Sequence, residues 1–172
     1  DLEPLFKYCT KLRALDIGHN SLRDISYMSR LTDLRVLIIA DNQWITDLSP
    51  LGALKNLEYL ELFTTCRARN FDFLNELTNL RYLNISNCIT LMNIDFLQYM
   101  PNLEKLWIMK QNGLTKAINA AKEQYPNVQI VNQCVVNGDS VTCCGWRAFD
   151  TNVAIRTAFT NWRHVVRFNS PE

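Results

Sequence analysis

The chain has 172 residues, the size of one ordinary domain that is long enough to bury a substantial core. Its formal net charge of +1 gives no indication of a nucleic-acid partner or of a basic membrane-binding surface. Six cysteines are more than most cytosolic domains of this size carry, though far fewer than a disulfide scaffold needs.

The chain opens with three apolar residues, Leu2, Leu5 and Tyr8, at a spacing of three that suits a short helical turn. No strand pattern precedes them, and no signal peptide, apolar membrane span or polar cap is visible. An uncapped end of a repeat array exposes core residues. We therefore interpret Asp1 as an internal boundary and expect more repeats upstream in the natural protein.

From residue 12 to residue 111 one strand pattern recurs five times. Each copy has two leucines three residues apart, then Leu or Ile two residues later, then a polar or small residue. The copies are Leu12-Leu15-Ile17-Asn20, Leu34-Leu37-Ile39-Asn42, Leu57-Leu60-Leu62-Thr65, Leu80-Leu83-Ile85-Cys88 and Leu103-Leu106-Ile108-Gln111. Successive copies are 22 or 23 residues apart, so the middle leucines are expected to stack in one buried column of a solenoid.

The rest of each repeat agrees with this interpretation. Apolar triplets spaced by three predict short helical or 3₁₀ turns behind the strands. The triplets are Ile25-Met28-Leu31, Leu48-Leu51-Leu54, Phe71-Leu74-Leu77 and Ile94-Leu97-Met100. The polar residue that ends each strand pattern is expected to bond the backbone of the turn, forming a ladder. Gln111 is the least typical ladder residue, so the fifth coil is expected to be distorted, with the neighbouring Asn112 as an alternative ladder residue.

The pattern L-x-x-L-x-L-x-x-N, together with residues 45–51, resembles the leucine-rich repeats of bacterial internalins and the related short-repeat class. The resemblance covers residues 1–131. It implies an α/β fold: a right-handed curved solenoid with a parallel β-sheet on the concave face and short helical or 3₁₀ turns on the convex face. It also implies a secreted or cell-surface protein that binds a partner through the concave face.

Residues 132–172 do not follow the repeat and are expected to form an α+β cap that seals the last coil, so the domains are 1–131 and 132–172. Before them, residues 116–124 predict a helix and residues 128–131 a final strand. Asn137-Gly138 predicts a hairpin, and Asp150 or Thr151 could begin a helix that carries Ile155, Ala158, Phe159 and Trp162 on one face. The Gly145-Trp146-Arg147 stretch resembles C-terminal segments of repeat proteins from gut bacteria.

The hairpin suggests a disulfide between Cys134 and Cys143. If Val136 faces Val141, the two cysteines also face each other, and cross-strand partners lie about 4.5–5.5 Å apart, within disulfide reach. Cys144 is the less favoured partner, because a different turn would shift the register. The alternatives are free thiols, or a zinc site formed by Cys134, Cys143, Cys144 and His164, although the CxxC spacing that is usual in zinc sites is absent.

Residues between the inward leucines point to the concave face, where aromatic and Met side chains gather in coils three to five. Such enrichment is typical of protein-binding hot spots. The expected partner-binding residues are Tyr59, Glu61, Phe63, Tyr82, Asn84, Trp107 and Met109. As outward residues they are not expected to support the core, so Trp107→Ala should leave the fold intact. The alternatives are that these side chains only cover the sheet or are buried by another segment, and that Arg67 and Arg69 make a rim contact.

Catalysis finds no support, because neither histidine has a nucleophile motif nearby and no phosphate loop or HExxH motif is present. We expect no enzyme activity and no cofactor or metal. A protein partner is expected, with a glycan as the alternative, and no nucleic acid and no direct membrane insertion. The expected location is extracellular or on the cell surface. A targeting module of a larger effector enzyme and an intracellular regulatory scaffold are the competing interpretations.

Overall fold

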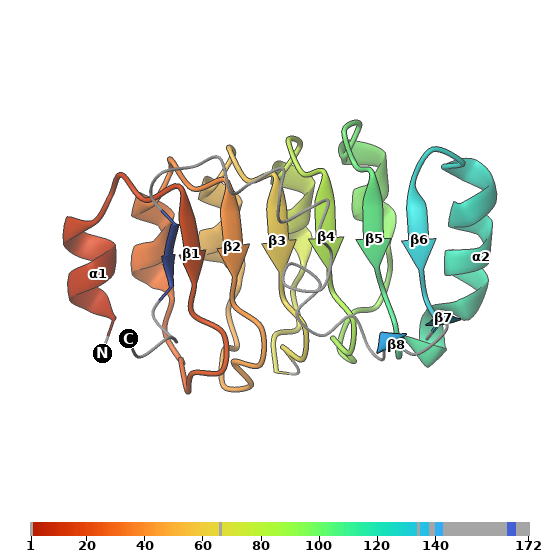
Figure 1. The fold of residues 1–172 in the computed structure, drawn as a ribbon, viewed down its shortest axis with the longest axis horizontal. Coiled ribbons are helices and arrows are strands. Elements are labelled where there is room, and N and C mark those ends of the chain that lie inside the picture. The colour runs from red at the N-terminus through yellow and green to blue at the C-terminus, as the bar shows by residue number, and fades with distance from the viewer. Residues whose placement is uncertain (1, 66, 134, 138–139, 143–164, 168–172) are drawn as a thin grey trace.

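The computed structural model describes residues 2–65, 67–133, 135–137, 140–142 and 165–167. Within them the chain coils into a solenoid whose strands stand side by side in one row, with the short turns behind them (Figure 1). The strands of the coils are β1 (Ala14–Asp16), β2 (Val36–Ile38), β3 (Tyr59–Glu61), β4 (Tyr82–Asn84), β5 (Lys105–Trp107) and β6 (Gln129–Val131). The 3₁₀ turns are η1 (Ser26–Arg30), η2 (Ser49–Ala53), η3 (Asp72–Glu76), η4 (Asp95–Tyr99) and η5 (Asn112–Leu114). Helix α1 (Glu3–Tyr8) opens the array, and α2 (Thr115–Gln124) replaces the turn before β6.

The sheet is parallel and its register follows the sequence repeat without a slip. The middle residue of each strand pairs with the middle residue of the next, from Leu15 through Leu37, Leu60, Leu83 and Leu106 to Ile130. The five leucines are at most 1% exposed, so the predicted buried column is confirmed.

The core lies between the sheet and the convex turns. The first apolar residue of each triplet precedes its 3₁₀ turn, the second lies inside it and the third ends it, so all three project toward the leucine column. Together with α1, α2 and the inward strand residues they form one continuous apolar cluster. The predicted 3₁₀ turns, the helix near residue 116 and the final strand near residue 130 are all confirmed.

The predicted ladder of side-chain hydrogen bonds to the backbone is present, although the residue that donates differs from coil to coil. The Asn42 amide donates to the Ile17 and Ile39 carbonyls at 2.9 and 3.0 Å, and the Cys88 thiol donates to the Leu62 carbonyl at 3.2 Å. Gln111 is only 7% exposed, and its side-chain amide reaches the Ile85 carbonyl at 3.3 Å. The alternative of Asn112 as the ladder residue is therefore wrong, because the longer side chain of Gln111 still reaches the carbonyl of the preceding coil.

The described part of the C-terminal segment contributes three further strands: β7 (Val135–Asn137), β8 (Ser140–Thr142) and β9 (Val165–Arg167). Strands β7 and β8 form the predicted antiparallel hairpin, with Val136 opposite Val141. This is the register on which the proposed Cys134–Cys143 disulfide depends. Both cysteines lie outside the described residues, so the disulfide stays a prediction, as does the division at residue 131.

Strand β9 lies where the sequence did not predict it. It pairs in parallel with β1, with Val166 opposite Leu15, and so extends the sheet at the edge farthest from β6 (Figure 1). The segment was expected to seal the last coil, whereas this strand of it lies on the first. The predicted helix of residues 151–162, His164 and the Gly145-Trp146-Arg147 likeness lie outside the described residues.

Candidate functional site

The sheet register brings the predicted partner-binding residues onto one face. Tyr59 pairs with Tyr82 and Glu61 with Asn84 across β3 and β4, and Asn84 pairs with Trp107 across β4 and β5. Phe63 and Met109 occupy the next outward position after their strands. The prediction that these side chains share the concave side of one sheet follows from the alternation of side chains along a strand.

Their burial differs from the expectation. Tyr59, Glu61 and Asn84 are 0% exposed, Met109 is 3% exposed and Trp107 is 6% exposed. An open sheet face keeps part of its side-chain surface in water, whereas these side chains are buried in this structure. Tyr59, Trp107 and Met109 also form a second apolar cluster with Ala14 and Val36, separate from the repeat core. Trp107 therefore has packing contacts in this cluster, which the expectation for Trp107→Ala did not include.

Polar contacts order the same face. The Tyr59 hydroxyl donates to a Glu61 carboxylate oxygen at 2.6 Å, inside the buried region. The Lys105 ammonium lies 4.7 Å from the centre of the Trp107 ring, and burial lowers the pKa of Lys105. Buried polar groups keep their partners because an unpaired one is costly. The face is thus built as an ordered interior surface, with Tyr82 and Ile38 half-buried at its margin.

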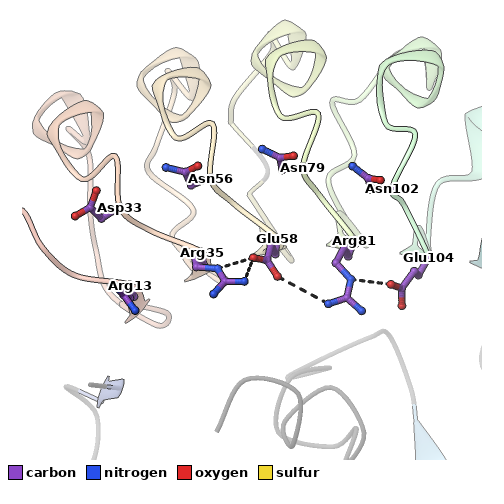
Figure 2. Close-up of a pocket in the computed structure, with 9 residues that line it drawn as sticks. All are labelled: Arg13, Asp33, Arg35, Asn56, Glu58, Asn79, Arg81, Asn102 and Glu104. Carbon is purple, nitrogen blue, oxygen red and sulfur yellow. Dashed lines mark hydrogen bonds and ion pairs between the residues drawn. The ribbon is translucent and has the colours of Figure 1, made fainter. Parts of the chain in front are cut away.

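A groove of about 700 Å³ runs along the edge where the strands begin, and one wall of it is a row of charges (Figure 2). Arg35 pairs with Glu58, Arg81 reaches Glu58 at 3.8 Å, and the Arg81 Nε donates to Glu104 at 2.7 Å. The row occupies the position just before each strand, and from β2 to β5 its residues alternate in sign between neighbouring coils. Arg13 occupies the same position before β1 and forms no ion pair with a described residue.

The charge row shifts the pKa values of its members. Burial raises the pKa of Tyr82, and the hydrogen bond that its hydroxyl donates to Glu104, 2.6 Å long, raises it further. Burial also tends to raise the pKa of Glu104, but hydrogen bonds from Arg81 and Tyr82 outweigh it, and the net shift is downward. The carboxylate of Glu104 is therefore held in its charged form by its neighbours.

The other wall of the groove is a second amide ladder, which the sequence analysis did not anticipate. This ladder is formed by Asn56, Asn79 and Asn102, each of which lies two residues before the charge-row residue of its own coil (Figure 2). Their side-chain amides donate to the carbonyls of Thr32, Lys55 and Thr78 in the preceding coil, at 2.9, 2.9 and 3.3 Å. The recurrence of asparagine at a 23-residue spacing was the signal that could have revealed it. Both walls are thus explained by coil-to-coil bonding.

The loops that follow the strands carry a third feature. One residue in each coil has a positive φ between 56° and 62°, and these residues are His19, Asp41, Thr64, Asn87 and Lys110. The turn that they make exposes the following loop. In the second coil that loop presents Trp44, which is 42% exposed and is stacked by Arg23 at 4.9 Å and Arg67 at 4.1 Å from the ring centre. Sequence reasoning selected Arg67 but missed the tryptophan beside it.

Comparisons with known proteins agree with the geometry. Residues 32–76 match the family model described as leucine-rich repeats in two copies. An internalin F structure from Listeria monocytogenes aligns with a TM-score of 0.55 at 23% identity, over 77% of this chain and 45% of that one. Internalin C2 from the same organism gives 0.51 at 27% identity, over 77% and 59%. A leucine-rich repeat protein from Leptospira interrogans gives 0.63 at 23% identity, over 74% and 33%. No curated protein sequence matches at a significant level.

The coils, their register and these likenesses define a leucine-rich repeat solenoid. Its repeats are similar to those of the two internalin structures. The chain spans less than two thirds of the length of each of these three structures. Proteins of this fold typically serve as interaction scaffolds and not as enzymes. Neither of the α-helices described here combines the length and apolarity that a bilayer crossing requires.

Proposed function

We propose that this chain is a protein-interaction module of a bacterial secreted or cell-surface protein, and that a protein partner binds across the concave face. The observation that carries the proposal is the second apolar cluster, which gathers Tyr59, Trp107 and Met109 on the side of the sheet away from the repeat core. The inward leucines already fill that core. Aromatic and Met side chains gathered outside it are the composition that central interface residues have.

The burial of this cluster defines how a partner reaches it. With Tyr59, Trp107 and Met109 between 0 and 6% exposed, these side chains are not the first that a partner contacts. First contact falls to the half-buried residues at the margin, Tyr82 and Lys105, which are neighbours across β4 and β5. The likeness to internalins supports a secreted or surface location.

The test is a binding screen against a panel of purified extracellular proteins by biolayer interferometry, followed by a Tyr82→Ala, Lys105→Ala double variant. Because both side chains are half-buried, this variant disturbs packing less than Trp107→Ala. A true concave partner should bind the double variant about 30-fold more weakly, the equivalent of about 2 kcal/mol. Thermal unfolding verifies that the variant is folded.

The matched control is Arg30→Ala, an exposed residue on the convex turn η1. It should bind the partner as the wild type does. Equal binding by the wild type and the double variant would move the site off the concave face. A screen in which no protein binds would contradict the interaction role itself.

A further inference from the structure

We infer that the loop edge of the solenoid carries a docking site for an acidic, partly apolar segment of a protein partner. The site is centred on the stack of Arg23, Trp44 and Arg67. The inference deepens the proposed function, since it rests on the chain binding a protein, and it assigns the contact to a surface other than the concave face.

The stack joins three successive coils. Trp44 belongs to the loop of the second coil, whereas Arg23 comes from the first and Arg67 from the third. Because each guanidinium carbon lies within 4.9 Å of the indole centre, the two carbons are no more than about 10 Å apart. The tryptophan holds both cations at fixed positions, so a partner that binds them loses little side-chain entropy.

The arginines of this surface are not paired with the acids of its own loops. Arg23, Arg67 and the nearby Arg69 are exposed, and none of the three forms an ion pair with any residue that the structure describes. The acids of the first two loops have other partners. Asp24 accepts the Ser26 backbone N–H at 2.8 Å, and Asp41 lies 3.1 Å from the His19 ring nitrogen.

This arrangement differs from the charge row at the other edge. There Arg35 and Arg81 alternate with Glu58 and Glu104, so these four charges neutralise one another. On the loop edge like charges lie together with a large aromatic surface between them. Carboxylates from a partner would supply the missing complement, and guanidinium–carboxylate pairs with planar, two-point geometry are the strong ones.

The neighbouring surface favours a protein over a polyanion without apolar groups. Two coils farther along the same edge, Ile89 is 63% exposed and Met92 is 79% exposed. Met92 occupies the loop position that Arg69 has in the coil before it. Exposed apolar side chains next to Trp and Arg are the composition of interface hot spots, and they offer nothing to a sulfated sugar chain.

The experiment measures fluorescence anisotropy of two labelled twelve-residue peptides, one with four glutamates followed by two leucines and the other with glutamines replacing the glutamates. The wild-type chain should bind the glutamate peptide more tightly than the glutamine peptide, and added salt should weaken that binding. An Arg23→Gln, Arg67→Gln double variant should bind it at least tenfold more weakly, and so should Trp44→Ala. Far-UV circular dichroism and thermal unfolding establish that these exposed substitutions leave the fold intact.

The matched control is Arg30→Gln, because Arg30 is also exposed and also lies over an aromatic ring, that of Tyr27, at 5.4 Å. It should bind the peptide as the wild type does. Equal binding by the wild type and the double variant would overturn the inference. A Tyr82→Ala variant is measured as well: if it alone loses binding, the peptide lies on the concave face and the inference is also overturned. Arginine-dependent binding of heparin without binding of the glutamate peptide would overturn the choice of a protein partner. None of these outcomes depends on the concave-face screen.

Discussion

Asn42 joins two coils through one side chain. Its amide nitrogen donates to carbonyls of both the first and the second coil, and its oxygen accepts the Leu22 backbone N–H at 3.2 Å. The side chain is 0% exposed, so water cannot replace these bonds when it is removed. Asn20 occupies the same ladder position in the first coil, but it is exposed and bonds only the Ile17 and Gly18 carbonyls of its own turn.

We predict that Asn42→Ala lowers the free energy of unfolding by about 2–4 kcal/mol, because it leaves buried backbone groups unpaired. Asn20→Ala should lower it by less than about 1 kcal/mol, since water reaches the groups that it leaves. Urea denaturation of the two variants and the wild type measures both values. If both variants lose the same free energy of unfolding, hydrogen bonding between coils at this position does not contribute to stability.

At this scale the sequence predicted inward residues better than outward ones. Leu60 and its equivalents are buried by their own repeat, so the local pattern defines their environment. Tyr59 and Trp107 project from the other side of the sheet, where the repeat pattern does not define their burial. Trp44 was missed for a related reason, since its two arginine partners come from different coils.

The charge row at the strand starts acts at the scale of elements, because it connects β2, β3, β4 and β5 at one edge. Glu104 ends it, and its pKa is lower in the folded chain than in the unfolded chain. A lowered pKa means that folding favours the carboxylate. Its contribution to stability is therefore present above the ordinary pKa of glutamate and is lost as the pH falls through the lower, folded-state pKa.

We predict that Glu104→Gln lowers the free energy of unfolding at pH 7 by no more than about 1 kcal/mol, because the side chain is 48% exposed and water screens the pair. The difference from the wild type should shrink below about pH 4 and vanish near pH 2, when the wild-type carboxyl is protonated. Urea denaturation across this pH range measures it. The control is Glu123→Gln on the exposed side of α2, which should show no such dependence. A difference that persists at pH 2 would mean that the loss is one of packing and not of charge.

Among the elements, the sequence predicted nearly every strand and turn that obeys the 23-residue spacing. The hairpin β7–β8 was predicted as well, because its turn signal, Asn137-Gly138, is local. The placement of β9 was not predictable in this way. Val165, Val166 and Arg167 make a short apolar-rich strand that could pair with any free sheet edge, and nothing local distinguishes β1 from β6.

At the scale of the whole molecule, β9 ties the end of the described chain to its first strand. A solenoid is otherwise stabilised only by contacts between neighbouring coils. Pairing with β9 gives β1 a strand on both sides, as the inner strands have. The first coil is therefore protected at an edge where the backbone groups of a terminal strand usually meet water.

We predict that removal of residues 165–172 raises the amide hydrogen-exchange rate in β1 by at least about tenfold, because these amides then lie in an edge strand. Exchange in β4 should not change. Mass spectrometry of deuterated peptides resolves both strands. The control removes only residues 168–172, which leaves β9 in place and should leave β1 protected. Unchanged exchange in β1 after the longer deletion would show that β9 does not support it.

The pairing of β9 with β1 also has a consequence for synthesis on the ribosome. About 150 residues separate the paired segments, and translation at roughly 5–20 residues per second leaves β1 without this neighbour for about 8–30 s. Coils two to five can stack on β1 within that time, since each needs only the coil before it. The edge of β1 that β9 occupies lacks this neighbour until residues 165–167 emerge, so this interval is when a trans-acting chaperone, or a second nascent chain on the same message, could occupy it.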